Sequence, residues 1–230
     1  MMRVEHLAYY FSRNGQPFFK DVSFQLKSPG VNFLIGQNGA GKTTLADIIT
    51  GLRPAQGELD LPKAAIYLNQ QLPLLSSIRV RDVAQLVLGI EHGRLRLTTE
   101  QLQQLIDTQA YQFLAPLWDQ HYGQLSGGQR KLVQLLLFLQ VDRELIVLDE
   151  PTAAVDRENV QLLFQVMQAH PERTYLMITH DVRDLHAFTD YQVLWLNDRQ
   201  VTTLSKRTFE AASAQAASAQ ADFVALFKTQ

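Results

Sequence analysis

Gly36-Gln37-Asn38-Gly39-Ala40-Gly41-Lys42-Thr43-Thr44 is the most informative stretch of this chain. It follows a short apolar run at residues 31–35 and precedes a helix-like segment at 45–52. A strand, a glycine-rich turn and a helix in this order are typical of a phosphate-binding loop, in which backbone N–H groups point at phosphate oxygens. The positive end of the helix dipole adds to the attraction. The stretch therefore predicts a site for a nucleoside triphosphate.

The side chains of this loop have distinct expected parts. We expect Lys42 to contact the β- and γ-phosphates and the Thr43 hydroxyl to hold Mg²⁺. The alternative is a glycine-rich turn with a solvated lysine, but the strand before it and the helix after it favour the phosphate site. The residues of the loop expected to bind ATP are Gly36, Asn38, Gly39, Ala40, Gly41, Lys42, Thr43 and Thr44.

Composition narrows the possible classes of protein. The chain has 230 residues, of which 46% are hydrophobic and 19% charged, enough for one large domain or a core with a subdomain. Its net charge is −2 and no run of Lys or Arg marks a nucleic-acid surface. The absence of cysteine excludes disulfides and thiolate chemistry. No apolar stretch approaches the roughly 20 residues that span a bilayer, so we expect membrane association only through a partner.

Apolar periodicity predicts an α/β core with a helical insertion. Residues 3–27 alternate as strands do around an Asn14-Gly15 turn, which indicates an antiparallel β layer. Residues 72–124 instead repeat apolar side chains at helical spacing, over 80–88 and over 102–114, with an N-cap region at Thr98. Two ordinary crossover helices remain the alternative to an inserted subdomain.

The second half of the chain alternates between strands and helices. Its predicted elements are a helix at 130–140, a buried strand at 144–148, a helix at 157–170, a strand at 174–179, a short helix at 183–188 and a hairpin over 191–204 with Asn197-Asp198 in the turn. From residue 206 the chain is rich in alanine, which favours a loosely packed terminal helix over a docking helix.

Five motifs in order over residues 5–205 resemble the ATP-binding subunit of ABC transporters. They are the loop at 36–44, Gln70, Leu125-Ser126-Gly127-Gly128-Gln129, Leu145-Ile146-Val147-Leu148-Asp149-Glu150, and His180. The resemblance implies an α/β fold with a P-loop (RecA-like) core, an N-terminal antiparallel β layer and an inserted α-helical subdomain. We expect a single ABC ATPase domain over 1–230, with the core and β layer at 1–71 and 140–205, the helical subdomain at 72–139 and the tail at 206–230.

The signature segment predicts a second anion site. Ser126, Gly127 and Gly128 present a hydroxyl and backbone N–H groups at a helix start. One chain does not need two γ-phosphate sites. The resemblance accordingly implies that two subunits pack head to tail around two ATP molecules, each bound by the loop of one copy and by Ser126, Gly127, Gly128 and Gln129 of the other.

The remaining motifs supply the expected catalytic groups. Asp149 would hold Mg²⁺, and Glu150 at the end of the same strand would polarise the attacking water. His180 resembles the switch histidine that contacts the γ-phosphate. Gln70 resembles the glutamine that reaches Mg²⁺ and the water, with Gln71 as the neighbouring alternative. Asp156 would face the partner subunit.

Adenine is expected to stack on Phe11, with Tyr10 or a core-packing role for Phe11 as alternatives. The chain departs from the family pattern at Gln37, where proline or serine is commoner. It departs again at Leu132 and Leu137, where arginines are common. None of these changes removes a group that touches phosphate.

The resemblance implies an ATPase that drives transport. Its expected partners are a second ATPase subunit, identical or different, and transmembrane permease subunits that dock on residues 70–123. We expect it at the cytoplasmic face of the cell membrane, with no span of its own and no nucleic acid partner. The alternative is a non-transport ABC ATPase that acts on nucleic acid or the ribosome, which salt-dependent nucleic-acid binding would reveal.

Overall fold

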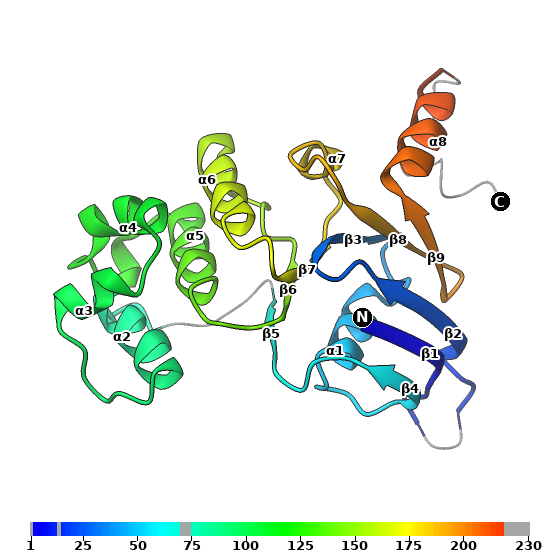
Figure 1. The fold of residues 1–230 in the computed structure, drawn as a ribbon, viewed down its shortest axis with the longest axis horizontal. Coiled ribbons are helices and arrows are strands. Elements are labelled where there is room, and N and C mark those ends of the chain that lie inside the picture. The colour runs from blue at the N-terminus through cyan, green and yellow to red at the C-terminus, as the bar shows by residue number, and fades with distance from the viewer. Residues whose placement is uncertain (1, 13–14, 70–74, 219–230) are drawn as a thin grey trace. The chain divides into compact units, whose positions relative to one another are not determined.

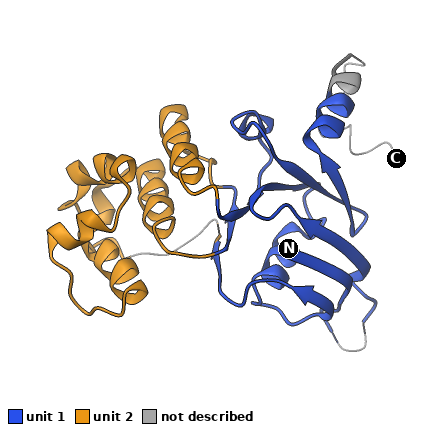
Figure 2. Ribbon diagram, viewed as in Figure 1, with its two compact units in different colours: residues 1–67, 144–150, 172–230 blue, residues 68–143, 151–171 orange. Residues whose placement is uncertain are grey.

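The computed structural model describes residues 2–12, 15–69 and 75–218, so Gln70 and Gln71 lie outside the described residues. The chain forms two compact units, one of residues 1–67, 144–150 and 172–230 and one of residues 68–143 and 151–171 (Figure 2). Residues 68–69, 140–143 and 151–171, which we expected in the core, group with the helices in this division. The subdomain boundaries given above therefore stay a prediction.

A six-stranded sheet forms the centre of the first unit, and Figure 1 labels its strands. The strands lie in the order β5 (Ala65–Leu68), β6 (Leu145–Asp149), β7 (Thr174–Ile178), β3 (Gly30–Gly36), β8 (Gln192–Asn197) and β9 (Gln200–Ser205). Neighbouring strands from β6 to β8 pair in parallel, and β9 pairs antiparallel with β8. The central strands read as apolar runs because both of their faces are buried.

The parallel pairing brings three predicted motifs to one edge of the sheet. Gly36 ends β3, Asp149 ends β6, and Ile178 ends β7 two residues before His180. Carboxyl ends of parallel strands lie at the same edge, which is where ligands bind in open α/β sheets. The glycine-rich loop, the acidic pair and the histidine therefore meet there.

The predicted antiparallel layer is present as β1 (Met2–Tyr9), β2 (Phe19–Leu26) and β4 (Gln56–Asp60), in the order β2-β1-β4. Helix α1 (Lys42–Ile49) packs between this sheet and the parallel one. Its buried side chains join a single apolar cluster with residues of both sheets, namely Leu45, Ala46, Ile48 and Ile49 with Val4, Leu7, Phe19, Val22, Leu34, Leu176 and Leu194. This packing fixes where the helix begins, directly after the loop.

The second unit contains the helices α2 (Val80–Glu91), α3 (Thr99–Gln104), α4 (Thr108–Leu114), α5 (Gly127–Phe138) and α6 (Arg157–Gln168). Helix α5 contacts α2, α4 and α6, and two short 3₁₀ turns lie at Ala115–Leu117 and Tyr122–Gln124. Leu132 and Leu137, two positions that depart from the pattern of the resemblance described above, are fully buried in this packing. The single helix predicted over 102–114 is wrong, because the chain forms α3 and α4 instead.

Asp107 explains that break. Its backbone N–H donates to the Gln140 side chain at 2.7 Å, and its carboxylate lies 2.9 Å from the His170 Nε2. These tertiary bonds replace the helical continuation, while Thr98 caps α3 as predicted. The first unit also carries the short helix α7 (Val182–Leu185) and helix α8 (Lys206–Ser218). Within the described residues, no helix combines the length and the hydropathy needed to span a bilayer.

Candidate nucleotide-binding site

The loop between β3 and α1 depends on glycine at three positions. A Cβ on Gly36 would lie 2.3 Å from the Leu196 carbonyl oxygen, so only glycine fits beside β8. Gly39 and Gly41 have φ of 79° and 113°, in the region that favours glycine. Helix α1 begins at Lys42, and its first backbone N–H groups have no acceptor within the helix. The turn therefore ends at an anion-binding helix N-terminus.

Lys42 places a cation beneath this loop. Its side chain is 8% exposed, and its Nζ donates to the carbonyl oxygens of Gly36 at 2.8 Å and Gln37 at 3.1 Å. Burial lowers the pKa of Lys42, while the carboxylates of Glu150 and Asp149 act in the opposite direction. A buried ammonium next to a helix N-terminus fits the binding of a phosphate group.

The acidic pair follows directly from β6. Burial raises the pKa of Asp149, and the Tyr67 hydroxyl, which donates to Asp149 Oδ2 at 3.1 Å, opposes that shift. Glu150 has a φ of 47°, and its N–H donates to the Ile178 carbonyl at the end of β7 at 2.8 Å. A non-glycine residue rarely adopts this φ, and such strain is concentrated at functional sites.

Glu150 and His180 lie together. The Glu150 Oε1 is 3.3 Å from the His180 Nε2. The turn that carries His180 is held by the buried Thr179 hydroxyl, which donates to Asp184 at 2.6 Å and accepts from the Asp181 N–H at 3.0 Å. A carboxylate and an imidazole in contact at the sheet edge can together bind and orient a water molecule.

The donor set fits the predicted Mg²⁺. Thr43 offers a hydroxyl in the first turn of α1, and Asp149 offers a carboxylate at the end of β6. Both are oxygen ligands of the kind that Mg²⁺ prefers, together with water and phosphate oxygens. Because burial disfavours the charge on Asp149, a neighbouring cation would stabilise that charge. The predicted third ligand, Gln70, lies outside the described residues.

The expected base contact, Phe11, is an exposed residue. Its side chain is 61% exposed, whereas Tyr10 is 38% exposed, so the core-packing alternative for Phe11 is wrong. The Phe11 ring packs edge-on against Tyr9 at 5.2 Å and against Phe18 at 4.8 Å between centroids. Its contact with adenine stays a prediction, and the exposure of the ring leaves a surface on which a base could stack.

The signature segment lies in the unit of helices and caps α5. Ser126 Oγ accepts from the Gln129 N–H at 3.2 Å, and the Gln129 side chain accepts from the Ser126 N–H at 2.9 Å. This reciprocal capping box uses the Gln129 amide oxygen within the protein. The contact of Gln129 with ATP, predicted above, stays a prediction. The Ser126 hydroxyl accepts one bond there and keeps its own proton to donate.

The two signature glycines differ in their surroundings. A Cβ on Gly127 would meet nothing within 4 Å, whereas a Cβ on Gly128 would lie 2.8 Å from the Ala154 carbonyl oxygen. Lys131 Nζ donates to the Ala153 carbonyl at 3.0 Å and holds the same segment. Asp156 then accepts from the Asn159 N–H at 3.0 Å and caps α6.

Residues 19–153, more than half of the chain, match the model of a protein family described as ABC transporter. The chain belongs to the ABC transporter family.

Its curated relatives in this family are ATP-binding proteins of transporters. A thiamine import ATP-binding protein of Vibrio cholerae is 31% identical over 75% of this chain and 77% of its own length. An energy-coupling factor transporter ATP-binding protein of Halalkalibacterium halodurans is 29% identical over 84% of this chain and 77% of its length. A ribose import ATP-binding protein of Bacillus subtilis is 29% identical, and this chain spans only 42% of its length.

Solved ABC structures share the fold. The chain is similar to an ATP-binding subunit of an ABC transporter, with a TM-score of 0.77 at 18% identity over 99% of this chain and 98% of that one. An ATP-binding cassette of an ABC transporter in its ADP conformation gives a TM-score of 0.75 at 21% identity, over 100% and 99% of the two chains. The predicted α/β fold class is thereby confirmed.

One interaction at this site was not predicted from the sequence. It is the hydrogen bond that the Tyr67 hydroxyl donates to Asp149. The alternation of apolar residues within a strand does not mark a hydroxyl that faces a neighbouring strand. The available signal was the position of Tyr67, three residues before Gln70. Only the adjacency of β5 and β6 in the sheet brings this hydroxyl to the acidic pair.

Proposed function

We propose that this chain is the ATP-hydrolysing subunit of an ABC transporter, and that it dimerises head to tail around two ATP molecules and drives transport through separate membrane subunits. The contact of Glu150 with His180 at 3.3 Å, at the sheet edge that also carries the Lys42 loop, is the observation that supports it most. Family membership agrees with this function.

The described residues suit distinct steps of hydrolysis. Lys42 and the α1 N-terminus bind the phosphates, and Glu150 accepts the proton of the attacking water while His180 orients that water. Bound Mg²⁺, for which the sequence predicts Thr43, Gln70 and Asp149 as ligands, would offset the negative charge of the phosphates. Phe11 stacks on the base and so places the triphosphate in the loop.

The signature segment serves the second copy. The Ser126 hydroxyl and the N–H groups of Gly127 and Gly128 point from a capped helix start and bind the γ-phosphate on the loop of the partner. ATP then holds two subunits together, and loss of the γ-phosphate lets them separate. A related cassette was solved as a dimer bound to ADP and Pi, which is in line with this arrangement.

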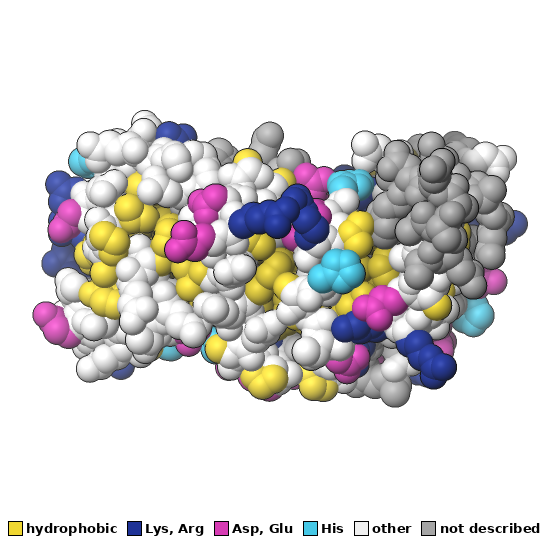
Figure 3. Space-filling view, turned by 90° about the horizontal axis from the view of Figure 1, so that it is seen from above, with side chains coloured by type: hydrophobic (Ala, Val, Ile, Leu, Met, Phe, Trp, Pro, Cys, Tyr) yellow, Lys and Arg dark blue, Asp and Glu magenta, His cyan; other side chains and the backbone are white. Residues whose placement is uncertain are grey.

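The membrane partners would dock on residues 70–123 and place this chain at the cytoplasmic face of the membrane. Several relatives are named as import proteins, for ribose, thiamine and molybdate, which favours import as the direction. On the face drawn in Figure 3, Lys and Arg side chains lie in separate groups among Asp and Glu. Binding of DNA or RNA that weakens steeply with salt would instead favour the non-transport alternative.

Replacement of the general base tests this function. Glu150→Gln keeps the size of the side chain but cannot accept a proton, so we expect ATP turnover to fall by about 10²-fold or more while ATP still binds. Dimers should accumulate in ATP, measured by sedimentation velocity. Glu58→Gln, an exposed acid in β4, is the matched control and should hydrolyse ATP as the unmodified chain does. Ordinary turnover by Glu150→Gln would overturn the assignment.

A further inference from the structure

We propose that Phe18 is a positioning residue of the nucleotide site, whose ring sets the spacing between the base platform at Phe11 and the phosphate loop at Gly41. Arg199 holds that ring from the β8–β9 hairpin. This role rests on the proposed function, because it presumes that the loop binds the phosphates of a nucleotide. Neither Phe18 nor Arg199 belongs to the five motifs of the sequence.

The first contact joins Phe18 to the phosphate loop. A Cβ on Gly41 would lie 2.6 Å from Cε1 and 3.0 Å from Cζ of the Phe18 ring. The backbone of Gly41 therefore rests on the edge of this ring, one residue before α1 begins. Gly41 has a φ of 113°, a backbone conformation that other residues rarely adopt. Movement of the Phe18 ring changes what supports the loop.

The second contact joins Phe18 to Phe11. Their ring centroids are 4.8 Å apart at an interplanar angle of 73°, an edge-to-face pair. The backbone is tied at the same place, because the Phe18 N–H donates to the Tyr9 carbonyl at 2.7 Å. Phe11 is 61% exposed and so depends on few neighbours for its orientation. Among the described residues, the rings of Phe18 and Tyr9 pack against it, and the Arg53 guanidinium lies 6.0 Å from its centroid.

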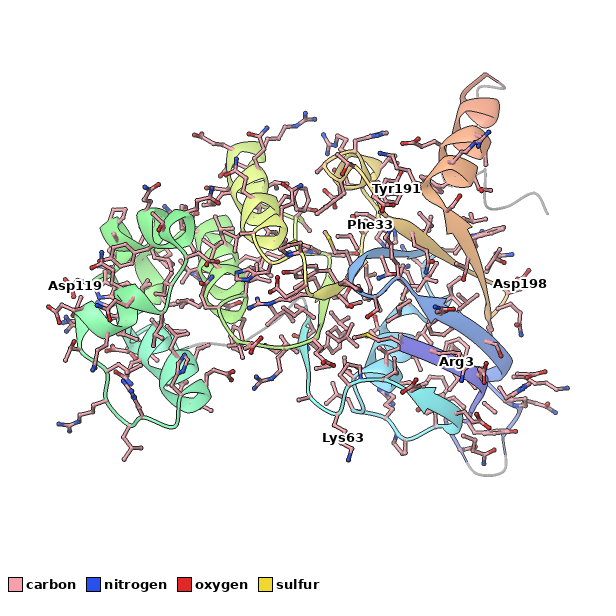
Figure 4. The ribbon with its side chains drawn as sticks, in the orientation of Figure 1. Arg3, Phe33, Lys63, Asp119, Tyr191 and Asp198 are labelled. Atoms are coloured by element: carbon pink, nitrogen blue, oxygen red, sulfur yellow. The ribbon has the colours of Figure 1, made fainter. Side chains whose placement is uncertain are left out.

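The third contact comes from a distant part of the chain. The Arg199 guanidinium lies 4.3 Å from the centroid of the Phe18 ring, within the range of a cation–π contact. Arg199 and Asp198 form the two-residue turn between β8 and β9, with φ of 63° and 46°. Figure 4 labels Asp198 at the tip of this hairpin. The Gln200 side chain donates to the Lys20 carbonyl at 3.0 Å and anchors the hairpin beside Phe18.

These contacts give the ring one function. Its edge supports the phosphate loop, Phe11 packs against it and Arg199 covers a face. The base and the phosphates of a nucleotide are parts of one ligand, so the distance between Phe11 and the loop must match that ligand. Leucine at position 18 would still fill space next to Gly41 but would leave Phe11 with Tyr9 as its one aromatic neighbour among the described residues. We therefore expect base recognition to suffer and phosphate binding to persist.

The test compares a ligand with a base and a ligand without one. Calorimetry measures the Kd of ADP and of pyrophosphate for the full chain, for Phe18→Leu, for Phe11→Ala and for the double variant. Phe18→Leu should weaken ADP binding about fivefold, as the loss of an aromatic pair does, and change pyrophosphate binding less than twofold. The double variant should bind ADP no more weakly than Phe11→Ala alone. In steady-state assays, KM for ATP should rise more than kcat falls.

Controls separate this role from folding. Phe24→Leu alters a buried ring further along β2 and should bind ADP as the unmodified chain does. Arg199→Gln should weaken ADP binding by about twofold, in the same direction as Phe18→Leu. Unchanged ADP affinity in Phe18→Leu, equal loss of both ligands, or additive effects of Phe11→Ala and Phe18→Leu would each overturn the role of Phe18. If the unmodified chain binds neither ligand, the proposed function itself fails.

Discussion

Substitution of the two signature glycines by alanine separates a structural role from a ligand role. A methyl group on Gly127 meets nothing within 4 Å, and alanine is a better helix former than glycine by up to about 1 kcal/mol. At the first residue of α5 we expect a gain of about 0.5 kcal/mol in the free energy of unfolding. A methyl group on Gly128 would lie 2.8 Å from the Ala154 oxygen, and overpacking of this kind costs about 1–3 kcal/mol.

Thermal unfolding measures these differences. At about 2–4 °C per kcal/mol for a chain of this size, Gly127→Ala should melt about 1–2 °C above the unmodified chain and Gly128→Ala about 2–12 °C below it. ATP turnover should not follow this order of stability, because the more stable variant, Gly127→Ala, is expected to lose activity. Gly127 faces open space where the partner's γ-phosphate is proposed to bind, so its methyl group should block that approach. We expect Gly127→Ala to lose about 10²-fold in ATP turnover, the scale of removing one anion-binding contact.

The dimer gives the second readout. In a Glu150→Gln background, Gly127→Ala should stay monomeric in ATP while its ADP affinity is retained, because the loop at 36–44 is untouched. A Gly127→Ala chain that hydrolyses ATP and dimerises normally would refute the head-to-tail arrangement, since the helix tip could then not be a phosphate site. A Gly127→Ala chain that is strongly destabilised would refute the reading of its surroundings as open space.

Two further predictions concern side chains outside the five motifs. Tyr67→Phe removes the hydroxyl that donates to Asp149, so it should raise the Mg²⁺ concentration needed for half-maximal ATP binding by about 10-fold in a Mg²⁺ titration. Tyr122→Phe, at a buried tyrosine of the second unit, is the control and should leave this concentration unchanged. Equal effects of both substitutions would contradict the prediction. Glu91 binds Arg143 through two bonds of 2.8 and 2.9 Å, which hold the pKa of Glu91 below its usual 4.5. A lowered carboxyl pKa adds stability above about pH 4.5 that is lost as pH falls through the folded-state value. Glu91→Gln should therefore lower the free energy of unfolding, measured in urea, by about 1 kcal/mol at pH 7 and by little at pH 3.5. An equal loss at both pH values would contradict a stabilising ion pair.

Local patterns were sufficient for most of the fold. The strand and glycine-rich turn at 31–44, the alternation before residue 27 and the cap at Thr98 were predicted correctly, because backbone preferences and hydrogen bonds within a few residues determine them. The helices expected to begin at residues 45 and 130 instead begin at Lys42 and Gly127. The helix predicted over 102–114 failed because Asp107 bonds Gln140 and His170, which lie 33 and 63 residues away. Such partners compete with a local helical pattern and leave no mark in it.

For the site, the residue types and their order along the chain predicted the chemistry, since glycine, lysine and carboxylates are each required by phosphate and Mg²⁺. The tertiary structure determined which other side chains contact these residues. The Tyr67 hydroxyl reaches Asp149 across 82 residues, and Arg199 covers the Phe18 ring from a hairpin far along the chain. These contacts depend on the order of strands in the sheet and on the packing of one sheet against the other. A periodic pattern specifies which face of a strand is buried, but not which strand lies beside it.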